Sequence, residues 1–183
     1  VIRAVEDAAR DLCRYPDPGC RELTAALSGR EGVASGAILC GCGAAELIYA
    51  YCGALGAVRA LMPAPAFLEY GAALEAFGGE EEPFPLKEEE GFALTEAFLT
   101  ALERTDCGTV FLCSPNNPTG RLVRPELLEE ICRICHRRRL RLFVDECFLE
   151  LSDRGREASL AGWLDSFPGL FLLRAFTKSY GMA

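Results

Sequence analysis

Short strand-like runs that alternate with helix-patterned stretches constrain the fold of this 183-residue chain most strongly. We predict strands over residues 37–40, 58–62, 80–86, 109–113, 140–144 and 170–173. Helices are predicted over residues 1–13, 21–28, 44–52, 67–77, 96–104, 125–139 and 159–164. Such alternation is typical of a mostly parallel sheet with helices on both faces, so we predict an α/β fold.

Length and composition fit one domain with a sizeable core, because half of the residues are hydrophobic and a quarter are charged. The net charge of −8 gives no electrostatic support to a nucleic-acid or anionic-membrane role. No apolar run has the length of a membrane span, and no signal peptide is visible. We therefore expect a cytoplasmic protein with neither nucleic-acid nor membrane partners.

Both ends of the chain look cut. Val1 begins in helical rhythm without an initiator methionine, and the last residue follows Lys178 by only five positions. We expect residues 1–183 to form one domain of a larger protein.

Most of the ten cysteines lie in apolar segments, where a cysteine behaves as a small hydrophobic residue. The run Cys132-Arg133-Ile134-Cys135-His136 matches the C-x-x-C-H pattern of haem attachment. It lies in a helix-patterned stretch, and its histidine is the only one in the chain, so a zinc site would lack ligands. We expect neither haem nor metal.

Four polar stretches each follow a predicted strand: Gly41–Ala45, Asn116–Gly120, Asp145–Glu146 and Thr177–Lys178. In an open α/β sheet the loops at the carboxyl ends of the strands meet at one crevice. These stretches are therefore expected to converge, although they are far apart in sequence.

Their side chains indicate a consistent chemistry. A helix that begins at Ala44 and Ala45 offers backbone amides and a dipole to a phosphate, although a tight turn would need the same flanking glycines. Asp145 can keep a pyridine nitrogen protonated, but a single aspartate is more often a cap or a salt-bridge partner. Asn117 can donate to a phenolate oxygen, or can serve the turn alone. Lys178 can form a Schiff base if partial burial lowers its pKa, or can be a solvated cation.

The motifs resemble those of fold-type I pyridoxal-phosphate enzymes, specifically the class I/II aminotransferase superfamily. Ser114–Gly120 resembles the family's Asn-Pro-Thr-Gly motif, Asp145–Phe148 its Asp-Glu-Ala-Tyr stretch, and Phe176–Gly181 its Schiff-base motif. Arg14–Pro18 resembles a motif of the histidinol-phosphate aminotransferase branch. The resemblance covers essentially the whole chain.

The resemblance implies pyridoxal 5'-phosphate as cofactor and assigns a role to each motif residue. Lys178 would form the internal aldimine and move the α-proton, and Asp145 would pair with the ring nitrogen. Asn117 would contact the ring oxygen, while Ala44 and Ala45 would bind the phosphate through their backbones.

Three aromatic residues and a threonine complete the implied site. Phe67 occupies the position of the aromatic that stacks on the cofactor ring, with Tyr70 as the alternative stacker. Thr177 would help to bind the phosphate, because Ala175 stands where relatives often have a serine. Tyr15 resembles a tyrosine that reaches the neighbouring active site, which implies a homodimer.

The resemblance also orders the functional hypotheses. The leading one is a histidinol-phosphate-aminotransferase-like enzyme that acts on an amino acid or a phosphorylated amine. The alternative is threonine-phosphate decarboxylase of cobalamin synthesis. The sequence around Lys178 and the phenylalanine at position 148 of this chain resemble that enzyme. A third hypothesis is a non-catalytic ligand-sensing domain of a regulator. We expect the family's small C-terminal domain to lie outside these 183 residues, and we expect the residues alone to be inactive.

Overall fold

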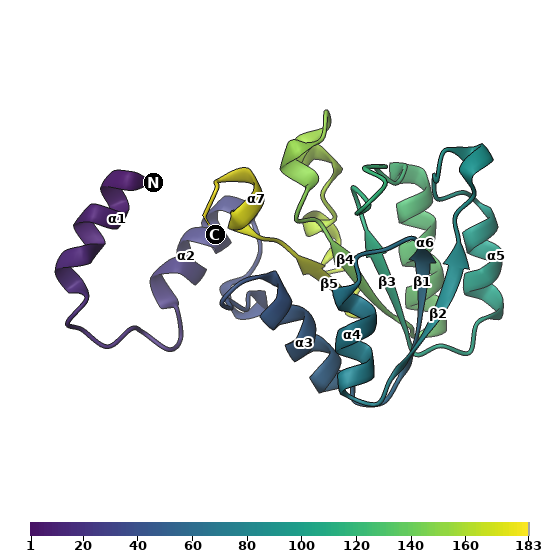
Figure 1. The fold of residues 1–183 in the computed structure, drawn as a ribbon, viewed down its shortest axis with the longest axis horizontal. Coiled ribbons are helices and arrows are strands. Elements are labelled where there is room, and N and C mark those ends of the chain that lie inside the picture. The colour runs from purple at the N-terminus through teal and green to yellow at the C-terminus, as the bar shows by residue number, and fades with distance from the viewer. Residues whose placement is uncertain (183) are drawn as a thin grey trace.

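A computed structural model describes residues 1–182, and a five-stranded, wholly parallel sheet forms its centre (Figure 1). Ala183, the last residue of the predicted domain, lies outside the described residues. The strands, in the spatial order β2-β1-β3-β4-β5, are β1 Arg59–Ala64, β2 Glu80–Pro85, β3 Thr109–Cys113, β4 Arg141–Asp145 and β5 Leu170–Leu173. The predicted α/β fold class is confirmed.

Seven α-helices accompany the sheet in residues 1–182. They are α1 Ile2–Ala8, α2 Arg21–Glu31, α3 Ala44–Leu55, α4 Glu69–Ala76, α5 Ala97–Arg104, α6 Pro125–Arg138 and α7 Phe176–Ser179. Short 3-10 turns lie between them at Ala9–Asp11, Ser35–Ala37, Glu88–Glu90, Leu149–Leu151, Gly155–Ala158 and Ala161–Trp163. The helix predicted over residues 159–164 is thus a single 3-10 turn.

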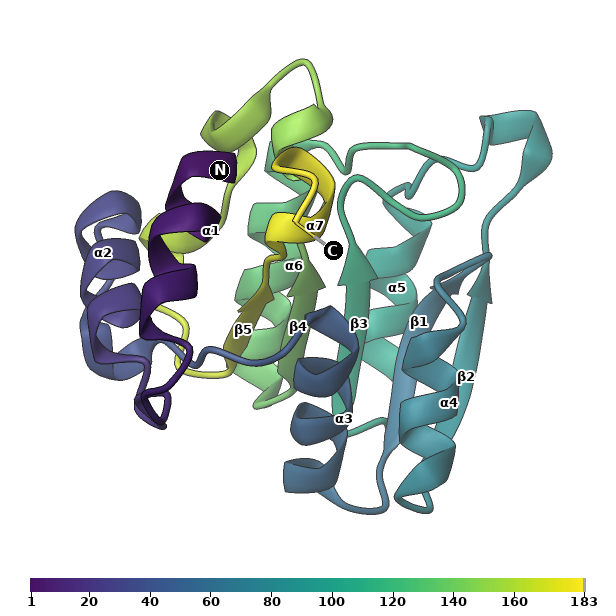
Figure 2. The ribbon, with the colours of Figure 1, turned by 60° about the vertical axis from the view of Figure 1, so that its left-hand side comes forward.

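Helices cover both faces of the sheet and create two hydrophobic cores (Figures 1 and 2). Helices α5 and α6 pack on one face, where Val110 and Leu112 point, and α3 and α4 pack on the other, where Phe111 points. Because side chains alternate along a strand and both faces are buried, β3 must be apolar throughout. This explains the continuous apolar runs in the sequence.

The prediction of a strand over residues 37–40 is wrong. Ile38 has extended backbone angles, with φ −111° and ψ 126°. A strand nevertheless needs a neighbour for its amides and carbonyls. Among residues 1–182 the sheet contains five strands, and none of them pairs with this segment.

The N-terminal helices lie beyond the β5 edge of the sheet, and Figure 1 shows α1 standing away from it. Helix α1 buries none of its residues, and Ile2 is 76% exposed. Among the helices of residues 1–182, none combines the length and the apolar character needed to cross a membrane.

Candidate functional site

The order of the strands fixes where a site can form. The chain passes from β1 outward to β2 and then returns to β3 on the other side of β1. The order in which the strands are connected therefore reverses between β1 and β3, although all strands are parallel. Ligands of open α/β sheets bind outside the carboxyl ends of the strands at such a point. The loops after β1 and β3 are joined there, because Asn116 Nδ2 donates to the Pro65 carbonyl at 3.2 Å.

Asp145 ends β4 beside this point and is 4% exposed. Its Oδ2 accepts a hydrogen bond from the Tyr70 hydroxyl at 2.7 Å, and its Oδ1 accepts one from the Cys147 amide at 2.8 Å. These donors, found among residues 1–182, are both neutral. Since a buried carboxylate is costly without a compensating charge, the site suits a ligand that brings a cationic group.

Tyr70 belongs to the core and cannot stack on a ligand ring. It is 1% exposed and packs against Phe111, with 5.5 Å between the ring centroids. Burial and the neighbouring Asp145 raise the pKa of Tyr70 well above its usual value, so its phenol remains a hydrogen-bond donor. The alternative role as ring stacker is therefore wrong. Phe67, 36% exposed and edge-on to Tyr70 at 5.6 Å, stays the predicted stacker.

Lys178 lies in α7, directly after the strand that neighbours β4. Its Nζ is 5.5 Å from the centroid of the Phe148 ring, a cation–π distance, so the amine reaches the loop that follows Asp145. The sequence left open whether Lys178 is partly buried, and within residues 1–182 it is exposed. Helix α7 is four residues long with no buried member, so little of the described chain shields it.

The Gly41–Ala45 loop has the geometry of an anion site. Gly43 has φ 92°, which only glycine adopts readily, and a Cβ at Gly41 would lie 2.8 Å from Leu47. The Cys42 amide donates to the Glu46 carboxylate. Ala44 and Ala45 open the twelve-residue helix α3, where backbone amides have no partner within the helix.

One cavity of about 400 Å³ joins this loop to the lysine segment. Gly43 and Ala44 line one side, and Ala175 and Thr177 line the other. The structure thus brings the two predicted phosphate-binding segments to the same space.

Of the predicted site residues, Ala44 and Thr177 line this cavity, whereas its lining does not include Tyr15, Ala45, Phe67, Asn117, Asp145 or Lys178. Asn117 is half-buried in the loop after β3. Tyr15 is 99% exposed on the N-terminal segment, so within residues 1–182 it contacts no other part of the site.

Sequence reasoning missed two features. The hydroxyl of Tyr70, 75 residues from Asp145 along the chain, gives no pattern that would reveal its partner. Glu146 and Arg174 pair across the ends of β4 and β5. A signal existed for this pair, since the two opposite charges lie within two residues of the ends of two successive predicted strands.

The C-x-x-C-H run does not gather metal ligands. Burial raises the pKa of both Cys132 and Cys135 to about 12, so both remain thiols. His136 instead lies edge-on to Phe167, 5.8 Å between centroids.

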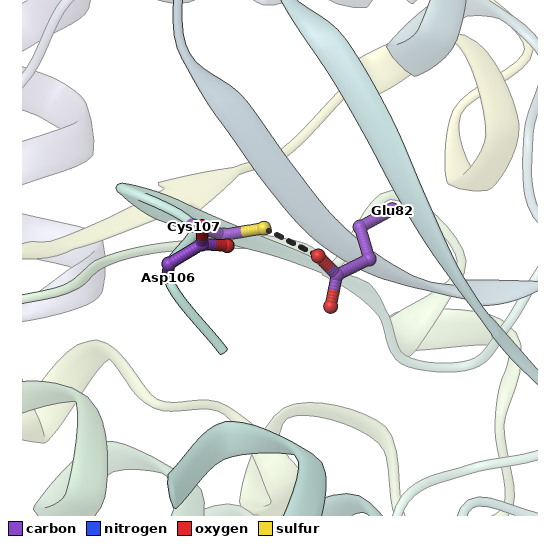
Figure 3. A group of neighbouring side chains, drawn as sticks. All are labelled: Glu82, Asp106 and Cys107. Atoms are coloured by element: carbon purple, nitrogen blue, oxygen red, sulfur yellow. Dashed lines mark hydrogen bonds between the residues drawn. The ribbon is translucent and has the colours of Figure 1, made fainter. Parts of the chain in front are cut away.

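One group of possible ligands does converge among residues 1–182, at the amino end of the sheet. The ligand atoms of Glu82, Asp106 and Cys107 lie within 4.8 Å of one another (Figure 3). Arg59 donates to both carboxylates, at 2.7 Å and 2.5 Å, which neutralises much of their charge. Burial raises the pKa of the Cys107 thiol. The group is an arginine cross-link between β1, β2 and the segment before β3.

Comparison with known proteins gives a consistent picture. The family model "Aminotransferase class I and II" matches residues 1–183. The threonine-phosphate decarboxylase of Salmonella typhimurium is 36% identical over 182 residues, all of this chain and 49% of the relative. The histidinol-phosphate aminotransferase of Stutzerimonas stutzeri is 33% identical over 184 residues, again the whole chain and 49% of the relative.

The fold matches solved structures as well. The histidinol-phosphate aminotransferase of Sinorhizobium meliloti in complex with pyridoxal-5'-phosphate superposes with a TM-score of 0.80 at 22% identity, covering 99% of this chain and 49% of that one. The chain thus spans about half the length of the curated relatives it matches.

Proposed function

The chain belongs to the class I and II aminotransferase family, and from that premise we propose that it is the cofactor-binding part of a pyridoxal-phosphate-dependent enzyme. The observation that carries the proposal is Asp145, a buried carboxylate with two neutral donors, one strand away from the Lys178 segment. A pyridine nitrogen would supply the missing positive charge. When bound, the cofactor supplies an electron-accepting ring for carbanion chemistry at an amino-acid Cα.

Each of the proposed site residues has a separate role at the cofactor ring. Asp145 would hold a proton on the ring nitrogen, and its own position is held by Tyr70 and the Cys147 amide. Lys178 would hold the cofactor through its amine and would move a proton to or from the substrate. Phe67 would cover one face of the ring, and Asn117 would donate to the ring oxygen.

The phosphate would occupy the space between α3 and α7. Ala44 lines this space, and the amides of Ala44 and Ala45 belong to the first turn of α3, at the positive end of the helix dipole. Thr177 lines the same cavity and offers a hydroxyl. The net charge of −8 does not attract an anion at long range, so local donors must provide the affinity.

Absorbance tests this assignment sharply because the chain has two lysines, Lys178 and Lys87. Lys87 lies at the far β2 edge and pairs with Glu90 at 3.7 Å. In the full-length protein, adding pyridoxal phosphate is expected to give a visible band that Lys178→Ala removes and Lys87→Ala keeps. A band that survives Lys178→Ala would overturn the proposal.

Two reactions are candidates for the full-length enzyme: amino transfer and decarboxylation. Amino transfer was the leading hypothesis from sequence, and relatives named histidinol-phosphate aminotransferase reach 33% identity. Decarboxylation is favoured by two relatives named threonine-phosphate decarboxylase, one of them putative, at 36% and 34% identity, together with Phe148 in place of the usual tyrosine. Both substrates would be phosphorylated, amine-bearing molecules.

The two reactions release different products. Full-length enzyme incubated with threonine phosphate is expected to release carbon dioxide without needing a 2-oxo acid. If amino transfer is the reaction, turnover of histidinol phosphate will instead require a 2-oxo acid acceptor and release no carbon dioxide.

A further inference from the structure

Glu146 is a buried charge that the proposed chemistry does not use. Its side chain is 2% exposed and follows Asp145 directly. Oε1 accepts from the Leu160 amide at 2.8 Å, and Oε2 accepts from the Ser159 hydroxyl and from Arg174 Nε, both at 3.0 Å. Both oxygens of this carboxylate thus accept hydrogen bonds from donors of the chain itself.

Arg174 connects Glu146 to a second segment of the chain. It lies four residues before Lys178, and its guanidinium also donates to Glu31 at 3.1 Å and to Ser159 at 2.6 Å. Glu31 is the last residue of α2, 143 positions from Arg174. The guanidinium therefore links helix α2 to the segment that carries Lys178.

The ion pairs continue outward to form a balanced network of three arginines and three glutamates. Arg156 contacts Glu31 at 2.8 Å, and Arg30 contacts Glu150 at 2.5 Å. Arg30 also lies over the Tyr180 ring, 5.4 Å from its centroid. Members of the network line the same cavity as Ala44 and Thr177.

We propose that Glu146 and Arg174 are positioning residues that set the placement of Lys178 against Asp145. The inference rests on the proposed function, because it concerns how that site is held together. Asp145 and Leu173 are register partners of β4 and β5, and the Glu146 amide donates to the Leu173 carbonyl at 2.9 Å. The ion pair begins where this pairing ends and extends the link between the two strands.

The physical need for such a link follows from the exposure of α7. Residues 176–179 bury nothing, so core packing does not fix the lysine segment. The Arg174 guanidinium donates through Nε to Glu146 and through Nη1 to Glu31, which restrains its orientation as well as its distance. A shift of about 1 Å in a catalytic group can cost about 100-fold in rate. Glu146 and Arg174 supply the restraint that packing lacks.

The test uses full-length, cofactor-loaded enzyme and the variants Glu146→Gln and Arg174→Lys. Glu146→Gln keeps the shape of the side chain but removes its charge. Arg174→Lys keeps the charge but replaces the planar guanidinium, with its several donors, by a single ammonium group. We expect kcat to fall roughly 10- to 100-fold in Glu146→Gln and less in Arg174→Lys, with KM nearly unchanged. The control Glu103→Gln removes a surface carboxylate that pairs with Arg137 on α5 and α6. It should behave as wild type.

A second readout does not depend on activity. In the cofactor-free protein, backbone amides of residues 174–180 should exchange hydrogen faster in Glu146→Gln than in wild type or Glu103→Gln. The pH midpoint of the visible absorption of the loaded protein should also move. Arg174→Lys provides the same readouts if Glu146→Gln fails to fold.

Two outcomes would overturn the inference. Wild-type kcat and unchanged exchange in both variants would show that the pair does not position Lys178, and a lowered melting temperature with unchanged kcat and absorption would assign it to stability alone. If the wild-type protein gives no band that depends on Lys178, the proposed function fails instead, which separates the two failures.

Discussion

At the residue scale, Tyr70 connects the core of the protein to the candidate chemistry. Its hydroxyl reaches Asp145 at 2.7 Å, and a hydrogen bond to a charged acceptor contributes about 1.5–3 kcal/mol. We predict that Tyr70→Phe weakens cofactor binding to full-length enzyme about tenfold, because the carboxylate loses a donor that stabilises and orients it.

Tyr51→Phe is the matched control for that prediction. Tyr51 lies in the same core and its hydroxyl contacts Thr109 at 3.3 Å, away from Asp145. Titration of the visible band with cofactor should show the loss in Tyr70→Phe alone. Equal dissociation constants for the two variants would contradict the role given to Tyr70.

Asp17 gives a pH prediction in the N-terminal motif. The Arg21 side chain donates to Asp17 Oδ2 at 3.0 Å, and this bond, with the backbone amides of Arg21 and Gly19, lowers the pKa of Asp17 from 3.8 to about 2. Because the folded pKa lies below the ordinary one, the stabilisation is complete above pH 3.8 and is lost as the pH falls through 2.

An NMR titration of the Asp17 carboxyl carbon measures this directly. The midpoint is expected near pH 2 in wild type and to return toward 3.8 in Arg21→Ala. An unchanged midpoint in that variant would assign the shift to another cause.

The places of Asp145 and Lys178 at the carboxyl ends of strands could be predicted from sequence, because Asp145 ends an apolar strand and Lys178 follows another by five residues. Their surroundings could not. Whether a lysine is buried depends on which segments pack over it, and whether a tyrosine stacks on a ligand or supports a carboxylate depends on contacts between distant residues. The error at Tyr70 and the open question of the burial of Lys178 both come from such long-range packing.

At the element scale, the turn between α4 and β2 depends on a close approach of backbones. A Cβ at Gly79 would lie 2.6 Å from the Val58 carbonyl oxygen and 3.2 Å from that of Leu74. Backbone atoms cannot move aside as a side chain can, so Gly79→Ala should lower the free energy of unfolding by about 1–3 kcal/mol.

Gly108→Ala is the control for this turn. It precedes β3 in the same way, but its added methyl group would meet no atom within 4 Å. Denaturant unfolding should show a lower midpoint for Gly79→Ala and a change within about 0.5 kcal/mol for Gly108→Ala. Equal midpoints would mean that the turn relaxes to admit the methyl group.

A strand could be predicted from sequence where its apolar run also has a neighbouring strand to pair with. The bounds of β3 and β5 match their predictions, since both are apolar runs beside strands that exist. Residues 37–40 have the same apolar pattern but no hydrogen-bonded neighbour among residues 1–182. A pattern can thus indicate extended backbone, whereas a strand also requires a partner.

At the scale of the whole molecule, helix α1 stands away from the sheet (Figure 1). We propose that full-length protein is a homodimer in which Tyr15, 99% exposed here, reaches the site of the neighbouring subunit. Mixing Tyr15→Ala with Lys178→Ala protein should then restore activity, because a mixed dimer contains one complete site.

Subunit exchange under mild denaturant, followed by assay, tests this assembly. Each variant alone should have little activity. A mixture no more active than the sum of its parts, although mixed dimers have formed, would show that Tyr15 serves its own subunit.

The central claim is that Lys178 is the residue that bonds to the cofactor. Borohydride reduction makes that bond permanent, and peptide mass spectrometry of reduced, cofactor-loaded, full-length enzyme then locates it. The account predicts the pyridoxyl mass on the peptide that contains Lys178. The same mass on another lysine, or on none, would contradict it.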